Sequence, residues 1–120
     1  MHRKTARGDK VEIYLHFIWT TWDRLPLVAE SWQEEMHAVI HGAVDGEGCF
    51  LLAVGGVEDH VHVVVSVRAT TRACDIVKVM KGASAQFGMR QVEGFKWRPT
   101  YAVFSVSRLN LPALKRYIRN

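Results

Sequence analysis

The chain has 120 residues, of which 48% are hydrophobic and 23% are charged, a composition that suits one globular domain without disulfide support. No apolar run approaches the roughly 18 residues of a membrane span, and the basic start of the chain lacks the apolar segment of a secretory signal. Two cysteines without metal or redox spacing, Cys49 and Cys74, fit core positions in a reducing cytoplasm. We therefore expect a single cytoplasmic domain over residues 1–120, in which residues 1–9 form a short flexible arm.

The net charge of +4 is distributed unevenly along the sequence. Residues 12–67 contain nine acids and one base, Arg24, whereas residues 68–120 contain eleven bases and two acids. This asymmetry favours a surface that faces a polyanion, although charges separated in the sequence can mix again in the fold. Nucleic acid is therefore a candidate partner, and its binding through phosphates would weaken steeply with salt.

Strand and helix patterns alternate along the first two thirds of the chain. The β-branched and aromatic run over residues 10–22 predicts a strand, and apolar residues at helical spacing from Trp32 to Ala43 predict a helix that ends near the glycines of residues 45–48. Residues 49–56 and 60–67 predict two strands joined by a tight turn. A second helix is expected over residues 70–92, capped by Thr70 or Thr71, and Gly82 inside it indicates close packing or the approach of a ligand.

The last third of the chain completes a known order of elements. Residues 101–107 predict a strand, and Asn110 and Pro112 mark the start of a C-terminal helix. The order β-α-β-β-α-β, followed by a helix, predicts an α+β fold of the ferredoxin-like type. We expect a four-stranded antiparallel sheet with helices packed on it, and a C-terminal helix that carries Tyr117.

The segment EDHVHVVV, residues 58–65, places two histidines in a strand that otherwise suits a core. Side chains at positions i and i+2 of a strand share a face, so His60 and His62 project together and can converge on one divalent cation. The alternative is a structural pair that is satisfied by backbone hydrogen bonds. Mg²⁺ or Mn²⁺ would need further oxygen ligands, and Glu58 and Asp59 are expected to be turn residues. Motifs of zinc hydrolases, serine hydrolases and P-loop proteins are absent from the sequence.

Four segments, taken in order, resemble the IS200/IS605-type Y1 transposases of the HUH nuclease superfamily, including relatives associated with repetitive extragenic palindromes (REP). The segments are YLHFIWTTWDRLPL, VEDHVHVVV, MKGASAQF and YAVFSVSRLNLPALKRYIRN, and the resemblance covers residues 11–120. It implies that His60 and His62 bind a divalent metal, Mg²⁺ or Mn²⁺, which polarises the scissile phosphate. It also implies that Tyr117 attacks the phosphorus, forms a 5′-phosphotyrosine and releases a 3′-hydroxyl.

The resemblance also implies partners. Members of the family are homodimers that share active sites between subunits and act on single-stranded DNA with hairpins, which would make this chain a cytoplasmic, nucleoid-associated protein. Trp97 is a weak candidate for stacking on a base, and a structural role for its ring is the alternative. Trp19, Trp22 and Trp32 are expected in core or dimer packing. Candidate phosphate contacts are the following basic residues of the second half: Arg72, Lys78, Lys81, Arg98, Arg108, Lys115, Arg116 and Arg119.

One departure from the family concerns a further metal ligand, often glutamine, one turn after the tyrosine. That position would be 121, beyond the sequence, and Asn120 would substitute for it only imperfectly. Two functions therefore stay open: an active transposase that nicks and rejoins DNA, or an impaired or domesticated relative that binds hairpins without cutting. A third alternative, a metal-sensing or small-molecule domain, leaves Tyr117 and the basic C-terminal half without a role.

Overall fold

The computed structural model describes the backbone of residues 3–4, and the backbone and side chains of residues 9–119. Two short strands, β1 (Arg3–Lys4) and β2 (Lys10–Val11), pair antiparallel ahead of the main sheet. The remainder of the expected N-terminal arm lies outside the described residues. Within residues 9–119 no helix has both the length and the apolar character needed to cross a membrane.

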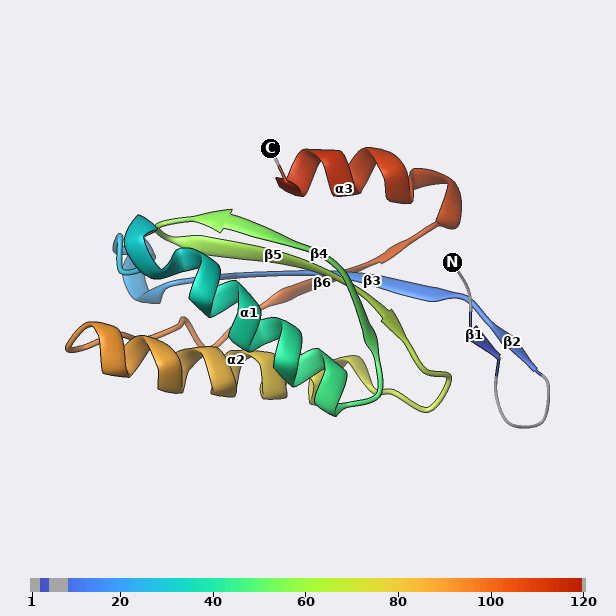
Figure 1. Cartoon of the computed structure of the whole chain (residues 1–120), viewed down its shortest axis with the longest axis horizontal. Helices are drawn as coiled ribbons and strands as arrows, with labels where there is room; N and C mark the ends of the chain where they lie inside the picture. Colours follow the sequence, from blue (N-terminus) through green and yellow to red (C-terminus); the bar gives the residue numbers. More distant parts are fainter. Residues whose placement is uncertain (1–2, 5–8, 120) are drawn as a thin grey trace.

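A four-stranded antiparallel sheet forms the centre of the fold (Figure 1). Its strands are β3 (Ile13–Thr20), β4 (Phe50–Val57), β5 (His60–Val67) and β6 (Ala102–Val106), in the spatial order β4-β5-β3-β6. In Figure 1, α1 (Glu30–Gly46) and α2 (Ala73–Gln91) lie below the sheet, and α3 (Leu111–Arg119) lies above it. The predicted ferredoxin-like α+β fold with an added C-terminal helix is confirmed.

Two short 3-10 helices modify the predicted boundaries. The first, η1 (Trp22–Arg24), ends the first predicted strand at Thr20, and the second, η2 (Arg108–Asn110), leads into α3. The start of α2 also differs, because the helix begins at Ala73 without a side-chain cap. Thr71 Oγ1 instead accepts a hydrogen bond from the Arg68 backbone N–H at 3.2 Å, so the predicted threonine cap is wrong.

The side chains of β5 alternate between two faces of the sheet. We call the face that α1 and α2 cover the closed face, and the face that α3 covers only in part the open face. Successive side chains of a strand point to opposite faces, and the valines of β5 that face α1 and α2 are at most 2% exposed: Val61, Val63, Val65 and Val67. On the other face a smaller cluster holds α3 against β4 and β5. Because His60 and His62 alternate with the core valines, both project toward the face that α3 covers only in part.

Tryptophan and cysteine positions test the predicted core. Trp19 is buried in the main core and Trp32 packs against it, as predicted. Trp22 is 45% exposed, so core packing is wrong for this residue, and dimer packing stays a prediction. Cys49 is buried as expected, whereas Cys74 is exposed near the start of α2.

Candidate metal and tyrosine site

The open face of the sheet brings the two histidines and the tyrosine together. The rings of His60 and His62 have centroids 4.9 Å apart and are nearly perpendicular, with 78° between their planes. Tyr117 of α3 lies edge-on to His62, with ring centroids 6.1 Å apart. These three residues line a pocket of about 240 Å³ together with Gly56, Val57 and Ile118. The structure therefore gathers the three predicted metal and catalytic residues at one place within a single chain.

Contacts at both ends of α3 determine where Tyr117 lies. Leu111 and Ile118 are 5% and 7% exposed within the smaller apolar cluster, and the Arg119 guanidinium donates a hydrogen bond to the Leu52 carbonyl at 3.2 Å. Gly55 of β4 permits this close approach, because a Cβ at that position would clash with the Ile118 carbonyl. With Ile118 turned to the sheet, Tyr117 stays 69% exposed at the edge of the pocket, open to a substrate.

Asp59 orients His60. One carboxylate oxygen lies 2.9 Å from His60 Nδ1, and the other accepts a hydrogen bond from Arg24 Nε at 3.0 Å. The hydrogen bond with His60, followed by the contact with Arg24, holds the pKa of the Asp59 carboxyl below its usual range. With the proton on Nδ1, His60 donates a hydrogen bond to the ionised carboxylate, and this would leave Nε2 free to bind a metal, in the manner of carboxylate-oriented metal ligands. Glu58 and Asp59 form the turn between β4 and β5, as predicted.

A third histidine, His16 of β3, orients His62. His16 Nε2 lies 3.1 Å from His62 Nδ1, and the two rings are stacked with centroids 5.3 Å apart. Burial, with smaller effects of His60 and His16, lowers the pKa of His62 to about 4, and burial also lowers the pKa of His16. Both rings are thus neutral at pH 7, and a proton on His62 Nδ1 donated to His16 leaves His62 Nε2 available to a cation.

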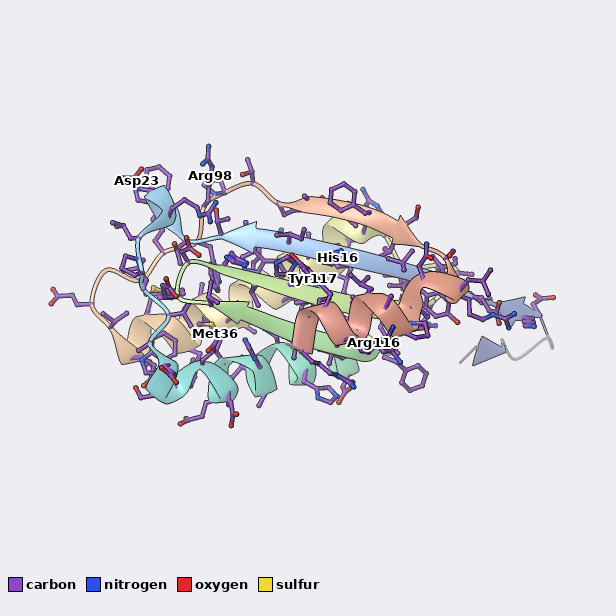
Figure 2. All side chains as sticks on the ribbon, turned by 90° about the horizontal axis from the view of Figure 1, so that it is seen from above. His16, Asp23, Met36, Arg98, Arg116 and Tyr117 are labelled. Carbon is purple, nitrogen blue, oxygen red and sulfur yellow. The ribbon has the colours of Figure 1, made fainter. Side chains whose placement is uncertain are left out.

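His16 was not predicted from the sequence as a site residue, although the pairing of its strand with the strand of His60 and His62 would have indicated it. Ile18 pairs with His62 and His16 pairs with Val64, so His16 and His62 are diagonal neighbours on one face. In Figure 2, which views the sheet from above, His16 and Tyr117 lie close together over its middle. A correct pairing of the first and third predicted strands would have found His16.

The donor set fits part of a divalent metal site. In His60 and in His62, Nδ1 is engaged by a neighbouring side chain, which would leave Nε2 of each ring for a metal. No group of three His, Cys, Asp or Glu residues that could hold a metal occurs in the part of the chain that the structure describes. Mg²⁺ or Mn²⁺ would therefore take further oxygen ligands from water or from a phosphate. The predicted substitute ligand, Asn120, lies outside the described residues.

The candidate phosphate contacts do not form one continuous group. Lys78 and Lys81 belong to α2, and Arg72 directly precedes this helix. They lie on the opposite side of the sheet from α3, which carries Lys115, Arg116 and Arg119 (Figure 1). Several of the predicted side chains already have protein partners: Arg72 with Asp75, Arg108 with Glu12, Arg119 with Leu52, and Lys81 with the carbonyls of Arg98 and Thr100. Binding of DNA by these residues stays a prediction, and those on α3 lie nearest to Tyr117.

The role predicted for Trp97 is wrong. This side chain is 6% exposed, its Nε1 donates a hydrogen bond to Ser84 Oγ at 2.9 Å, and its ring meets Trp19 and Phe95 edge-on. A ring enclosed in this way has no face open to a base. Its neighbour Arg98 is exposed, so it stays a candidate for a phosphate contact.

Comparisons with known proteins identify the family of this chain. Residues 9–120 match the family described as IS200-like transposases. The ISDra2 transposase TnpA of Deinococcus radiodurans is 23% identical over 128 aligned positions, which cover 100% of this chain and 91% of that protein.

Solved structures of transposases share the fold of this chain. A crystal structure assigned to a transposase of Deinococcus radiodurans R1 aligns with a TM-score of 0.80 and 25% identity, over 98% of this chain and 97% of that one. A REP-associated tyrosine transposase bound to a REP hairpin aligns with a TM-score of 0.69 and 10% identity, over 97% of this chain and 70% of that one. Since the family match spans nearly the whole sequence, this chain belongs to the IS200-like transposase family.

Proposed function

We propose that this member of the family is a metal-dependent transposase that cleaves and rejoins single-stranded DNA at hairpin-marked sites through a 5′-phosphotyrosine. The observation that carries the proposal is the meeting of Tyr117 with His60 and His62 in one open pocket. A nucleophile and two metal-binding imidazoles beside it are the groups needed for covalent attack on a phosphodiester. The REP hairpin held by one structural neighbour makes a folded single strand the first substrate to test.

In the proposed cleavage, Tyr117 Oη forms a bond to phosphorus while the bond from phosphorus to the 3′ oxygen breaks. The phenol loses its proton and the departing 3′ oxygen gains one, so the products are a 5′-phosphotyrosine and a 3′-hydroxyl. Attack by another 3′-hydroxyl reverses the step and rejoins a strand without a nucleotide cofactor. A divalent cation held by His60 and His62 would supply Lewis-acid polarisation of the phosphate. Asp59 and His16 keep the two imidazoles oriented for this role.

A hairpin-binding module that does not cut DNA is the second candidate. Its support is that His60 and His62 find no third side-chain ligand of the usual types within residues 9–119. Basic side chains on α3 would then bind the phosphate backbone without chemistry.

A denaturing gel separates the two candidates. The protein is incubated with Mn²⁺ and a hairpin that carries single-stranded flanks, labelled on the 3′ side of the presumed cut. The transposase proposal expects a protein–DNA adduct that Tyr117→Phe abolishes while hairpin binding, measured by anisotropy, is retained. Tyr14→Phe and Tyr101→Phe are the controls, since neither tyrosine lines the histidine pocket. Binding without an adduct under any divalent metal would favour the binding module.

We also propose that the active protein is a homodimer with exchanged tyrosine helices. In the single chain, Tyr117 lies beside its own His62, so exchange would require α3 to leave the contacts that Leu111 and Ile118 make with the sheet. Mixing inactive Tyr117→Phe protein with inactive His60→Ala/His62→Ala protein tests this directly. Recovery of the adduct supports shared sites, and a mixture that stays inactive although it dimerises contradicts them.

A further inference from the structure

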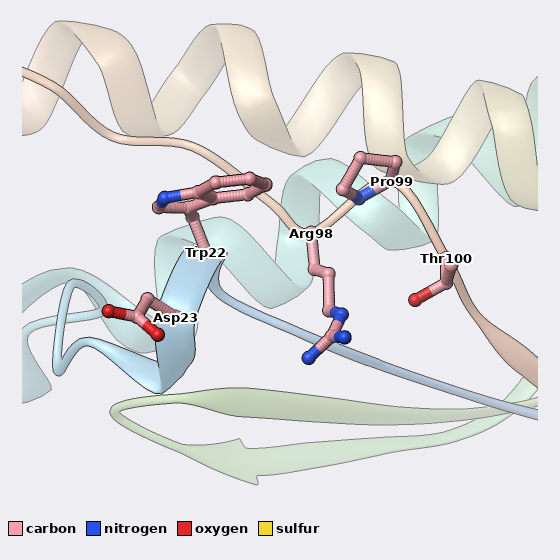
Figure 3. A pocket seen from close by; sticks show the side chains of 5 residues that line it. All are labelled: Trp22, Asp23, Arg98, Pro99 and Thr100. Carbon is pink, nitrogen blue, oxygen red and sulfur yellow. The ribbon is translucent and has the colours of Figure 1, made fainter.

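A second pocket opens at the end of the sheet where β3 leads into η1 (Figure 3). Its volume is about 370 Å³, near the lower end for small-molecule sites. Figure 3 shows Trp22 and Asp23 on one side, Pro99 and Thr100 on the other, and Arg98 between them. A space of this size suits a single planar group and is too small for a DNA duplex.

Backbone hydrogen bonds hold the two walls of this pocket together. The Trp22 N–H donates to the Lys96 carbonyl, and the Arg98 N–H donates to the Thr20 carbonyl, each at 2.9 Å. Between Lys96 and Arg98, the buried side chain of Trp97 points into the core. Because alternate residues of an extended segment point to opposite sides, both neighbouring cations are directed outward.

Trp22 presents one face of its ring to a ligand. The Lys96 ammonium lies over one face of the ring, 4.2 Å from its centroid. Trp22 lines the pocket and Lys96 does not, which agrees with Lys96 lying on the face that is turned away from the pocket. Asp23 and Arg24 have positive φ angles of 54° and 56°, which are costly for residues other than glycine. This turn leaves Trp22 45% exposed while Arg24 bonds to Asp59, the partner of His60.

Arg98 connects this pocket with the histidine site. Within residues 9–119 its guanidinium has no ion pair or hydrogen bond, so it is available to a phosphate. Arg98 also lines a hollow of about 300 Å³ across β3 and β6, which Thr20 lines as well. Thr20 is the direct cross-strand partner of His60. A strand whose phosphate lies at the histidines can therefore follow the open face of the sheet to Trp22.

From this arrangement we infer that the Trp22 pocket binds one unpaired base of the single-stranded segment that flanks the hairpin. The base stacks on the open face of Trp22, Asp23 accepts a hydrogen bond from an N–H group on the base edge, and Arg98 binds the adjoining phosphate. The inference rests on the proposed function, and it adds that the protein recognises an unpaired base next to the cleavage site. The competing occupant is a second copy of the chain, packed through Trp22.

The test places 2-aminopurine at each flanking position in turn and follows its fluorescence, which falls when the base stacks on an indole. The wild-type protein should quench the fluorescence of 2-aminopurine at one flanking position. Trp22→Phe should quench it in part, and Trp22→Ala should not quench it. Trp22→Ala should also weaken binding of the flanked hairpin about tenfold and leave binding of the flankless hairpin unchanged. Arg98→Ala should reduce the slope of log affinity against log salt by about 0.7. The matched control is Phe50→Ala, which removes another exposed ring, 52% exposed on the far edge strand.

The outcomes separate the inference from the proposed function. If the wild-type protein forms the Tyr117 adduct but no flanking position shows quenching that depends on Trp22, the inference is overturned and the proposed function stands. If the wild-type protein does not bind the single strand at all, both fail. If Trp22→Ala keeps the quenching but converts a dimer to a monomer, the second copy is the occupant and the inference is wrong. Circular dichroism melts of each variant verify that it is folded.

Discussion

The two faces of the sheet carry opposite kinds of residue on the same strands. On β5 the face toward α1 and α2 consists of valines that are at most 2% exposed, whereas the other face begins with His60 and His62, which are only half-buried. On β3, Phe17 is fully buried in the main core, while its neighbour His16 bonds to His62 on the open side. The closed face stabilises the sheet, whereas the open face holds His16, His60 and His62 in fixed positions near Tyr117.

This division has an energetic basis. Side chains on the closed face gain roughly 25 cal/mol for each Å² of apolar surface removed from water, so their identity matters for folding. On the open face, His60, His62 and Tyr117 stay partly or largely exposed and therefore contribute little burial, whereas the smaller apolar cluster under α3 is buried. Substitutions on the closed face should consequently change stability, and substitutions of the site residues on the open face should change activity.

The largest expected effect is the loss of cleavage on removing both histidines. His60→Ala with His62→Ala should abolish adduct formation in Mg²⁺ or Mn²⁺, because no imidazole remains to hold the metal beside Tyr117. The thermal midpoint should stay within a few degrees of the wild-type value, since neither ring belongs to an apolar cluster. A gel assay and a thermal melt on the same preparation measure both. A collapse of stability would instead indicate a structural histidine pair and contradict the division between the faces.

The next effect is expected on stability alone. Phe17→Ala should lower the free energy of unfolding by about 3–5 kcal/mol, because a fully buried ring leaves a cavity in the main core. Phe104 of the adjacent strand is the matched control: it is 55% exposed, and Phe104→Ala should cost less than about 1 kcal/mol. Urea unfolding curves provide the comparison. Equal losses for the two phenylalanines would mean that both faces contribute equally to the fold.

These two faces also differ in how far the sequence predicted them. The closed face follows from alternation and helical spacing alone, so its strands, helices and order were predicted with only their ends displaced. The pair His60 and His62 could be predicted because it lies within one strand. The contacts of His16 and Asp59 could not, since they depend on strand register and on a turn that brings Arg24 to the β4–β5 connection.

Tryptophans show the same limit in another way. Trp97 and Trp22 each lie among basic and turn residues in the sequence, and composition does not distinguish a buried ring from an exposed one. The structure buries Trp97 because its indole finds Ser84 on α2 and two aromatic neighbours. Trp22 is exposed because the backbone turns at Asp23. Exposure of an aromatic residue next to a turn is therefore decided by tertiary contacts that the local sequence does not encode.

A smaller effect is expected from His16, which we treat as a positioning residue because it acts through His62. His16→Ala should weaken Mn²⁺ binding about 10- to 100-fold, as the loss of a partner that orients a metal ligand typically does. His16→Gln should restore much of the affinity, because its amide oxygen can accept the proton of His62 Nδ1. Isothermal titration with Mn²⁺ measures the effect without requiring cleavage.

The control for His16 is another histidine that lies outside the site. His41 of α1 is exposed and forms a weak ion pair with Asp45 at 3.7 Å, so His41→Ala should leave Mn²⁺ affinity unchanged. If His16→Ala binds Mn²⁺ as tightly as the wild-type protein, the hydrogen bond to His62 has no positioning role. If glutamine restores nothing although the variant is folded, the stacked ring rather than the hydrogen bond is what matters.

The smallest effect concerns Gly82 of α2, on the layer that supports the closed face. The sequence predicted close packing or a ligand at this glycine, but a Cβ at Gly82 would meet no atom within 4 Å in the part of the chain that the structure describes, so close packing there is wrong. Gly82→Ala should therefore stabilise the protein by about 1 kcal/mol, since alanine lowers the entropy cost of an exposed helix position. That gain corresponds to a thermal midpoint roughly 4 °C higher. Gly88 is the control in the same helix: its Cβ would overlap the Phe95 ring, so Gly88→Ala should destabilise the protein.

If Gly82→Ala raises the melting temperature and leaves hairpin binding intact, the glycine has no contact with DNA. Weaker binding by this more stable variant would mean that a phosphate backbone approaches α2 at Gly82, and that the layer of α1 and α2 takes part in DNA binding as well as in folding.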